Sequence, residues 1–252
     1  RRVREKFADQ LTFLCYDYVD LAWRHTYCGL FSMKKDGVTW YFLDNEQYFD
    51  RPELYGYVDD GERFGFFSRA VVKMLDHLEF WPDVIHCNDW QTALIPIYLK
   101  DDGVREDRYR SIRTVLTIHN IEYQGRYGAD TVDQLFGLDR GWYNDGTLQM
   151  DGDVNLMKGA MLVSDAVTTV SPTYAAHDAA YAEGMEGVVR MIDGKFSGVV
   201  NGLDVAGYDP AHDPALPENY GVDHMAGKAA CKASLQASLG LAQEPDTPLM
   251  GI

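Results

Sequence analysis

Short apolar runs alternate with helical segments between residues 82 and 200, and this alternation limits the fold more than any other feature of the sequence. Strands that alternate with helices form βαβ units, whose strands lie parallel in one sheet. The sequence therefore predicts an α/β fold in which a parallel sheet is flanked by helices. The expected strands cover residues 82–87, 113–118, 166–170 and 196–200, and the expected helices between them cover residues 92–100 and 155–163 and begin again at Ser171 and Pro172.

A second region, residues 11–44, has the composition of antiparallel β structure. Residues 38–43 are β-branched and aromatic, and a turn-like stretch that ends at Gly37 precedes them. This pattern predicts a β-hairpin from about residue 27 to residue 43. The remaining expectations are a loop over residues 45–60 and helices over residues 61–78 and 225–239, the last of them ending at Gly240.

Polar side chains stand at the end of every expected parallel strand. They are His86, Asn88 and Asp89 after the first, His119 and Asn120 after the second, Ser171 after the third, and Asn201 and Asp204 after the fourth. Ligands of open parallel sheets bind beyond the carboxyl ends of the strands, where helix N-termini also offer free N–H groups. We therefore expect these side chains to converge on one cleft.

Each of these residues also has a purely structural interpretation. His86 would cap its strand inside the core, Asp89 would be the N-cap of the helix that follows, and Asn201, followed by glycine, would form a turn. The pair His119 and Asn120 favours function, because two polar groups after an apolar strand are costly to bury without partners. The tyrosine-rich residues 41–57 and 123–143 serve either as packing or as faces that stack on sugar rings.

Several classes of function are disfavoured. A formal charge of −16 argues against nucleic acid and anionic membrane as partners, and no apolar run approaches the length of a membrane-spanning helix. His86, Asp89 and His119 could bind a metal, but the sequence lacks H-x-x-x-H and H-E-x-x-H pairs, so we expect none. The G-x-S-x-G, P-loop and G-x-G-x-x-G motifs are also absent. Four irregularly spaced cysteines indicate a reducing compartment, the cytoplasm.

Two segments of the chain resemble a known enzyme family. Residues 82–91 (PDVIHCNDWQ) are similar to the H-x-H-D-W-H segment of bacterial glycogen synthases and plant starch synthases. Residues 117–125 (TIHNIEYQG) resemble the T-[VI]-H-N-x-x-Y-Q-G segment of the same family. Further similar segments follow in the family's order, at residues 156–160, 164–175 and 200–204, and the loop at residues 50–52 and the helix start at Arg63 and Phe64 also fit.

The resemblance implies a GT-B fold, in which two Rossmann-like domains face each other across a cleft. Residues 1–241 would then form the N-terminal, acceptor-side domain without its first strands, and residues 242–252 a linker and the start of the second domain. The chain would thus be truncated at both ends, and the missing C-terminal domain of the same protein would be its partner. The implied reaction transfers glucose from ADP-glucose, a co-substrate rather than a cofactor, to the non-reducing end of an α-1,4-glucan with anomeric retention.

The resemblance also implies roles for particular residues. Catalysis would depend on His119 and Asp89, and substrate would be bound by Asn120, Trp90, Asn201 and Tyr55. Glycosyl transfer passes through an oxocarbenium-like state, so oriented acceptors near the sugar ring can stabilise the developing positive charge.

The chain departs from the family in ways that bear on its activity. Asn88 and Gln91 stand where histidines are more usual, and the early K-x-G-G-L loop is absent. The later arginine and lysine that hold the diphosphate are also absent, together with the glutamate of the second domain. We therefore expect that this chain alone does not transfer glucose and that it self-associates through an open sheet edge. The alternatives are a glucan-binding module without catalysis and another GT-B glucosyltransferase, such as a sucrose synthase relative.

Overall fold

A computed structural model describes residues 2–103, 106–177 and 182–251. The chain divides into two compact units, Arg1–Val200 and Asn201–Ile252, and each is described by itself. The predicted domain boundary between residues 241 and 242 stays a prediction.

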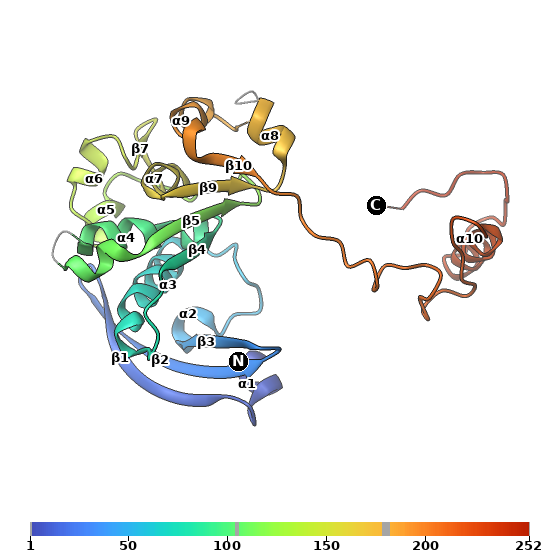
Figure 1. The fold of residues 1–252 in the computed structure, drawn as a ribbon, viewed down its shortest axis with the longest axis horizontal. Coiled ribbons are helices and arrows are strands. Elements are labelled where there is room, and N and C mark those ends of the chain that lie inside the picture. The colour runs from blue at the N-terminus through green and yellow to red at the C-terminus, as the bar shows by residue number, and fades with distance from the viewer. Residues whose placement is uncertain (1, 104–105, 178–181, 252) are drawn as a thin grey trace. The chain divides into compact units, whose positions relative to one another are not determined.

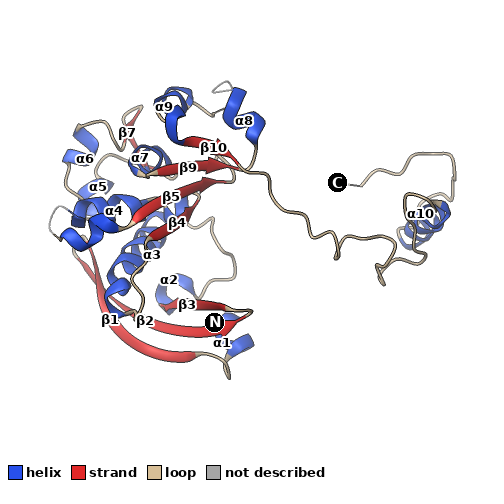
Figure 2. Ribbon diagram, viewed as in Figure 1, coloured by secondary structure: helices blue, strands red, loops and turns tan. Residues whose placement is uncertain are grey.

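A parallel sheet of four strands organises the first unit (Figures 1 and 2). Its strands are β4 (Val84–Asn88), β5 (Arg113–Ile118), β9 (Ala166–Thr169) and β10 (Phe196–Gly198). The spatial order is β10-β9-β5-β4, and every neighbouring pair is parallel. The predicted α/β fold with a parallel sheet is therefore confirmed.

One face of this sheet is buried and the other is largely open. Cys87, Leu116 and Val167 share the buried face and belong to the hydrophobic core. The same core includes residues of α3 (Asp60–Met74), α4 (Leu94–Gly103) and α7 (Leu156–Val163). Strand side chains alternate between faces, so His86, Asn88 and Thr117 lie on the open face.

The first 44 residues contain an antiparallel sheet, the meander. It consists of β1 (Thr12–Leu21), β2 (Arg24–Lys35) and β3 (Val38–Asp44) in that order. The predicted hairpin is confirmed, with Gly29 of β2 opposite Asp44 of β3. Its turn places Asp36 and Gly37 at φ 53° and 77°, the left-handed conformation that two-residue hairpin turns require.

The remaining elements are short. The helices are α1 (Arg2–Phe7), α2 (Glu46–Phe49), α5 (Thr131–Gln134), α6 (Gly141–Asn144), α8 (Pro172–His177) and α9 (Glu186–Met191), and 3-10 turns cover Leu75–His77, Trp90–Thr92, Asp107–Ser111 and Asp193–Lys195. The strands β6 (Arg126–Tyr127), β8 (Asp153–Asn155) and β7 (Gln149–Met150) form a small antiparallel sheet in that order.

Side-chain caps explain where two of the helices begin. The Ser171 hydroxyl accepts the N–H of Tyr174 at 3.1 Å, as the predicted helix start requires. The expectation of a continuous loop over residues 45–60 was wrong, because α2 interrupts it. Asn45 caps that helix by accepting the N–H of Tyr48 at 2.9 Å, so one helical turn forms despite its aromatic sequence.

The second unit holds α10 (Ala226–Ser238), which confirms the predicted last helix. Gly240, at φ 66°, follows it with the left-handed backbone that ends many helices. Within the described residues, no helix is both long enough and apolar enough to cross a membrane.

Candidate functional site

The backbone turns sharply where β4 ends. Asp89 has φ 55° and ψ −175°, a conformation that residues with a side chain rarely adopt. Its N–H donates to the carbonyl of Thr117 at 2.9 Å, so the pairing with β5 continues past the last strand residue. Strained backbone of this kind costs about 1–3 kcal/mol and persists where the surrounding structure enforces it, most often at functional sites.

The carboxylate of Asp89 joins the ends of two neighbouring strands. Its Oδ1 accepts the backbone N–H of His119 at 2.7 Å and, at 3.4 Å, that of Asn120. Asp89 occupies the N-cap position of the 3-10 turn Trp90–Thr92, as the structural interpretation expected, but its side chain makes no capping bond to that turn. No hydrogen bond of the second oxygen, Oδ2, was found among the described residues, which leaves it available to a ligand hydroxyl.

The His119 ring contacts a residue of β4. Its Nε2 lies 3.0 Å from Oδ1 of Asn88, and both side chains are exposed. An amide oxygen only accepts hydrogen bonds, so Nε2 donates here and Nδ1 of the neutral ring remains an acceptor. Asn88, one of the two departures from the family motif, thus sets the tautomer of the histidine beside it.

His86 lies on the open face of the sheet and not inside the core. Its Nε2 is 2.6 Å from the Thr117 hydroxyl, which is 2.7 Å from the hydroxyl of Thr168. The expectation that His86 caps its strand within the core was therefore wrong. The three side chains form a polar row across β4, β5 and β9, just below the strand ends that carry Asp89 and His119.

Two buried amides support the loop that carries His119 and Asn120. The Nδ2 of Asn155 donates to Oε1 of Gln124 at 2.7 Å. The Nε2 of Gln124 donates to the carbonyls of Ile121 at 3.2 Å and Glu183 at 3.0 Å. Buried amides must be satisfied, so this pair fixes the loop after β5 against the turn at Glu183, just before α9.

Sequence reasoning did not single out Gln124 and Asn155 as site residues. Asn155 could have been predicted as a helix cap, because it stands directly before an apolar helix. It caps α7 by accepting the N–H of Lys158 at 2.9 Å.

Comparisons with known proteins identify the family of the chain. The family model described as the starch synthase catalytic domain matches residues 2–191. The chain belongs to this family.

Curated members of the family are about twice as long as this chain. The glycogen synthase of Lactobacillus acidophilus is 43% identical over 250 residues, which are 98% of this chain and 52% of that protein. The glycogen synthase of Lactococcus lactis is 44% identical over 252 residues, 99% of this chain and 53% of the relative. This member of the family therefore spans about half the length of the curated relatives it matches.

A solved family structure shares the fold. The catalytic domain of starch synthase IV from Arabidopsis thaliana, bound to ADP and acarbose, superposes with a TM-score of 0.77 at 32% identity. The match covers 92% of this chain and 49% of that one. The fold predicted from the resemblance, a domain of the GT-B type, is thereby supported over most of the chain.

The remaining predicted site residues are Trp90, Tyr55 and Asn201. Trp90 is only 8% exposed, and its ring packs edge-on against Phe64 with centroids 5.1 Å apart. Tyr55 is exposed on the loop between α2 and α3. Asn201 opens the second unit and is described with it. Substrate binding by these three residues stays a prediction.

Neither a reactive cysteine nor a metal-binding cluster is present beside the site among the described residues. Burial raises the pKa of the Cys87 thiol to about 12, so this cysteine next to the strand end stays neutral and is no nucleophile. Among the described residues, no group of three or more His, Cys, Asp or Glu side chains is placed to hold a metal ion.

Proposed function

We propose that this chain is the acceptor-side part of a retaining glucosyltransferase. Its reaction moves glucose from ADP-glucose to the 4-hydroxyl at the non-reducing end of an α-1,4-glucan. The observation that carries the proposal is the junction of Asp89, His119 and Asn120 at the ends of two adjacent parallel strands. Ligands of parallel sheets bind at that edge.

The three side chains have complementary tasks. Oδ2 of Asp89 accepts a sugar hydroxyl and orients it, while Oδ1 keeps the His119 and Asn120 backbone in place. Nδ1 of His119 is an oriented acceptor near the transferred ring, where positive charge develops. Oδ1 of Asn120 accepts the N–H of Glu122 at 3.0 Å, which leaves its amide N–H groups as donors for a sugar oxygen.

Donor and acceptor are inferred from the relatives. The curated relatives are named glycogen synthases, and the solved neighbour is bound to ADP and acarbose. These names support a nucleotide sugar as donor and a glucan as acceptor. We also propose the cytoplasm as the compartment, and the missing C-terminal domain of the same protein as the partner that completes the donor site.

The isolated chain has little or no transferase activity under this proposal. The groups that would neutralise the leaving diphosphate lie outside it, and such groups contribute strongly to phosphate-leaving reactions. Binding of glucan without turnover is therefore the expected behaviour of the chain by itself, and it is also the second candidate function.

A chimera tests the proposal. The chain is joined to the parts of the Lactobacillus acidophilus glycogen synthase that have no counterpart in it, and transfer of labelled glucose from ADP-glucose to glycogen is measured. His119→Ala should lower kcat by about 100-fold or more, the usual effect of losing one oriented electrostatic group. Tyr208→Ser, an exposed position in the second unit, is the matched control and should leave kcat unchanged.

Two outcomes contradict the proposal. Full activity of the His119→Ala chimera removes the assigned site. Rapid turnover by the isolated 252-residue chain shows that the diphosphate needs no groups from elsewhere. A chain that binds glycogen, together with a chimera that folds but never transfers glucose, favours the non-catalytic binding module.

A further inference from the structure

We propose that the outer face of the meander is a second glucan-binding surface, separate from the β4 and β5 strand ends. We call it the aromatic strip, and it consists of Phe13, Tyr16, Tyr18, His25, Tyr27 and Phe31. The glucan class of its ligand rests on the proposed function, whereas the surface itself is defined by the structure of β1 and β2.

The register of β1 and β2 separates two faces of the meander. Val19 and Leu21 of β1 are buried, as are Cys28 and Leu30 of β2, so this face lies against the core. Tyr18 pairs with Tyr27 on the opposite face, and Tyr16 pairs with Gly29. Successive strand residues alternate between faces, which places these tyrosines on the side away from the core.

The aromatic rings on the outer face contact one another but remain accessible. Tyr16 and Tyr18 are 59% and 43% exposed. The Tyr16 and Tyr27 ring centroids are 5.9 Å apart, and the ring of His25 stacks on Tyr18 at 4.7 Å and 7°. Contiguous exposed aromatic surface is uncommon on a soluble protein and marks binding sites. The contacts hold the rings as a preformed surface, so little side-chain entropy is lost on binding.

A β-bulge extends the aromatic strip along the sheet. Phe13 lies opposite Phe31 and Tyr16 lies opposite Gly29, although Phe13 and Tyr16 are three residues apart. The register shifts between Phe13 and Cys15, and this irregularity brings both aromatic residues to one face. Phe13 contacts Phe31 edge-on, with centroids 5.2 Å apart, so the strip is elongated and suits a linear chain of rings.

Gly29 gives the strip room in its middle. A Cβ at this position would lie 2.6 Å from the Tyr27 hydroxyl and 3.2 Å from Cβ of Asp44. Any side chain at residue 29 would therefore displace the Tyr27 ring from its place beside Tyr16.

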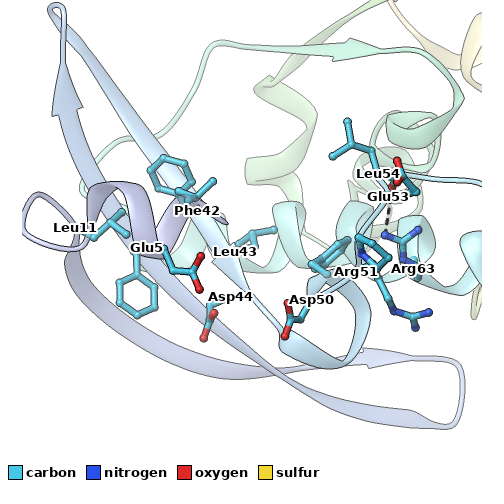
Figure 3. Close-up of a pocket in the computed structure, with 14 residues that line it drawn as sticks. Glu5, Leu11, Phe42, Leu43, Asp44, Asp50, Arg51, Glu53, Leu54 and Arg63 are labelled. Carbon is cyan, nitrogen blue, oxygen red and sulfur yellow. Dashed lines mark hydrogen bonds between the residues drawn. The ribbon is translucent and has the colours of Figure 1, made fainter. Parts of the chain in front are cut away.

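The strip continues into a hollow of about 680 Å³ (Figure 3). Phe31 lines this hollow, together with Phe42 and Asp44 of β3. Figure 3 shows Asp44 on one side and Arg51, from the loop after α2, on the other. None of the predicted site residues is among those that line this hollow.

The charges around the strip favour a neutral ligand with hydroxyl groups. Asp20 lies among the rings, with its carboxylate 2.6 Å from His25 Nδ1, and the chain carries a formal charge of −16. An anionic partner is repelled by this field. A glucan matches the surface, since its apolar C–H faces stack on the rings and its hydroxyls donate to the carboxylate and phenol oxygens. A second copy of this acidic chain is the less suitable occupant.

The test measures binding of glycogen and maltoheptaose to the complete 252-residue chain, by affinity electrophoresis and by calorimetry. The double variant Tyr16→Ser/Tyr18→Ser should bind glycogen at least tenfold more weakly, whereas the Tyr208→Ser control should bind it as the unmodified chain does. Tyrosine nitration supplies a measurement that needs no variant. Glycogen should shield Tyr16 and Tyr18 from the reagent and leave Tyr208 reactive.

The arms of this experiment separate the strip from the proposed function. His119→Ala should weaken glycogen binding less than the double variant does. If only His119→Ala abolishes binding and the tyrosines stay reactive, the strip is wrong and the proposed function stands. If the unmodified chain binds no glucan, both the strip and the glucan acceptor are wrong. If the double variant only converts a dimer to a monomer in light scattering, the strip is a contact between copies.

Discussion

The two large sheets of this chain carry the two surfaces proposed to bind ligands, and these surfaces are built in opposite ways. The parallel sheet ends in polar groups that directional hydrogen bonds hold in place, and Asp89 is strained to make them. The meander presents rings that touch one another on an open face, with no comparable strain at Tyr16 or Tyr18. The first surface therefore depends on precise backbone geometry, whereas the second depends on strand register and exposed area.

Replacing a glycine with alanine should destabilise the chain more beside the parallel sheet than in the meander. Gly125, at φ 64°, lies under Trp90, and a Cβ there would be 2.7 Å from Cε3 of the buried indole. We expect Gly125→Ala to lower the free energy of unfolding by about 2–4 kcal/mol, from left-handed strain and overpacking together. Gly37→Ala in the meander hairpin is the control, since φ is 77° but nothing lies within 4 Å. Gly37→Ala should lower the free energy of unfolding by about 1–2 kcal/mol. Equal losses for the two variants in urea unfolding would contradict the proposed difference between the two sheets.

Asp89 offers a sharper test of the strained edge. Asp89→Ala removes the acceptor for the His119 and Asn120 N–H groups and keeps the strain, so we expect a loss of about 2 kcal/mol. Asp89→Gly removes the same acceptor but relaxes the backbone, which should recover about 1 kcal/mol of that loss. Urea denaturation gives the difference, and amide hydrogen exchange at His119 reports the freed N–H. A glycine variant no more stable than the alanine variant would show that Asp89 is unstrained.

The aromatic strip should tolerate substitution much better. Tyr16→Ser/Tyr18→Ser removes exposed cross-strand ring contacts, each worth a fraction of a kcal/mol, so we expect a total loss of about 1 kcal/mol. Thermal unfolding followed by circular dichroism measures it. A loss as large as that of Gly125→Ala would mean that these tyrosines belong to the core and not to a binding surface.

The smallest effect concerns pH at the amino edge of the parallel sheet. Burial by itself raises the pKa of Asp165, but hydrogen bonds from Thr114 and the ion pair with Arg113 outweigh it and bring the pKa below its ordinary value. A lowered pKa in the folded state stabilises the chain above the unfolded pKa, and this contribution disappears as pH falls through the folded value. The unfolding free energy should therefore decline below about pH 4.

Asp165→Asn isolates this contribution. The side chain is 38% exposed, so solvent screens the ion pair and the effect should be modest. We expect urea unfolding at several pH values to show that the unfolding free energy of the variant falls less steeply at acid pH than that of the unmodified chain. If the unfolding free energies of the two chains fall equally with pH, Asp165 does not contribute to the acid sensitivity.

Much of the fold was predictable because its signals are local. Strands β4, β5 and β9, of four to six residues, lie in apolar runs of the sequence, and Ser171 before a proline marks a helix start that the structure confirms. The one-turn helix α2 was missed because its capping residue, Asn45, precedes an aromatic sequence that resembles a loop. Strands of two residues, such as β6 and β7, carry too few residues for any alternation to be visible.

The candidate site was predictable in place but not in detail. Polar residues after neighbouring parallel strands must meet at one sheet edge, and Asp89 and His119 do so. The contact of Asn88 with His119, and the buried Gln124 and Asn155 pair, depend on how loops fold over the edge. The aromatic strip was not predictable, because a single bulged residue decides which face Phe13 shares.

A crystal structure of this chain grown with maltoheptaose would show directly whether the strand ends bind sugar. We expect a glucose ring at the carboxyl ends of β4 and β5, with hydroxyls bonded to Oδ2 of Asp89 and Nδ1 of His119. Sugar bound only elsewhere, with these two atoms turned to partners within the protein, would contradict it.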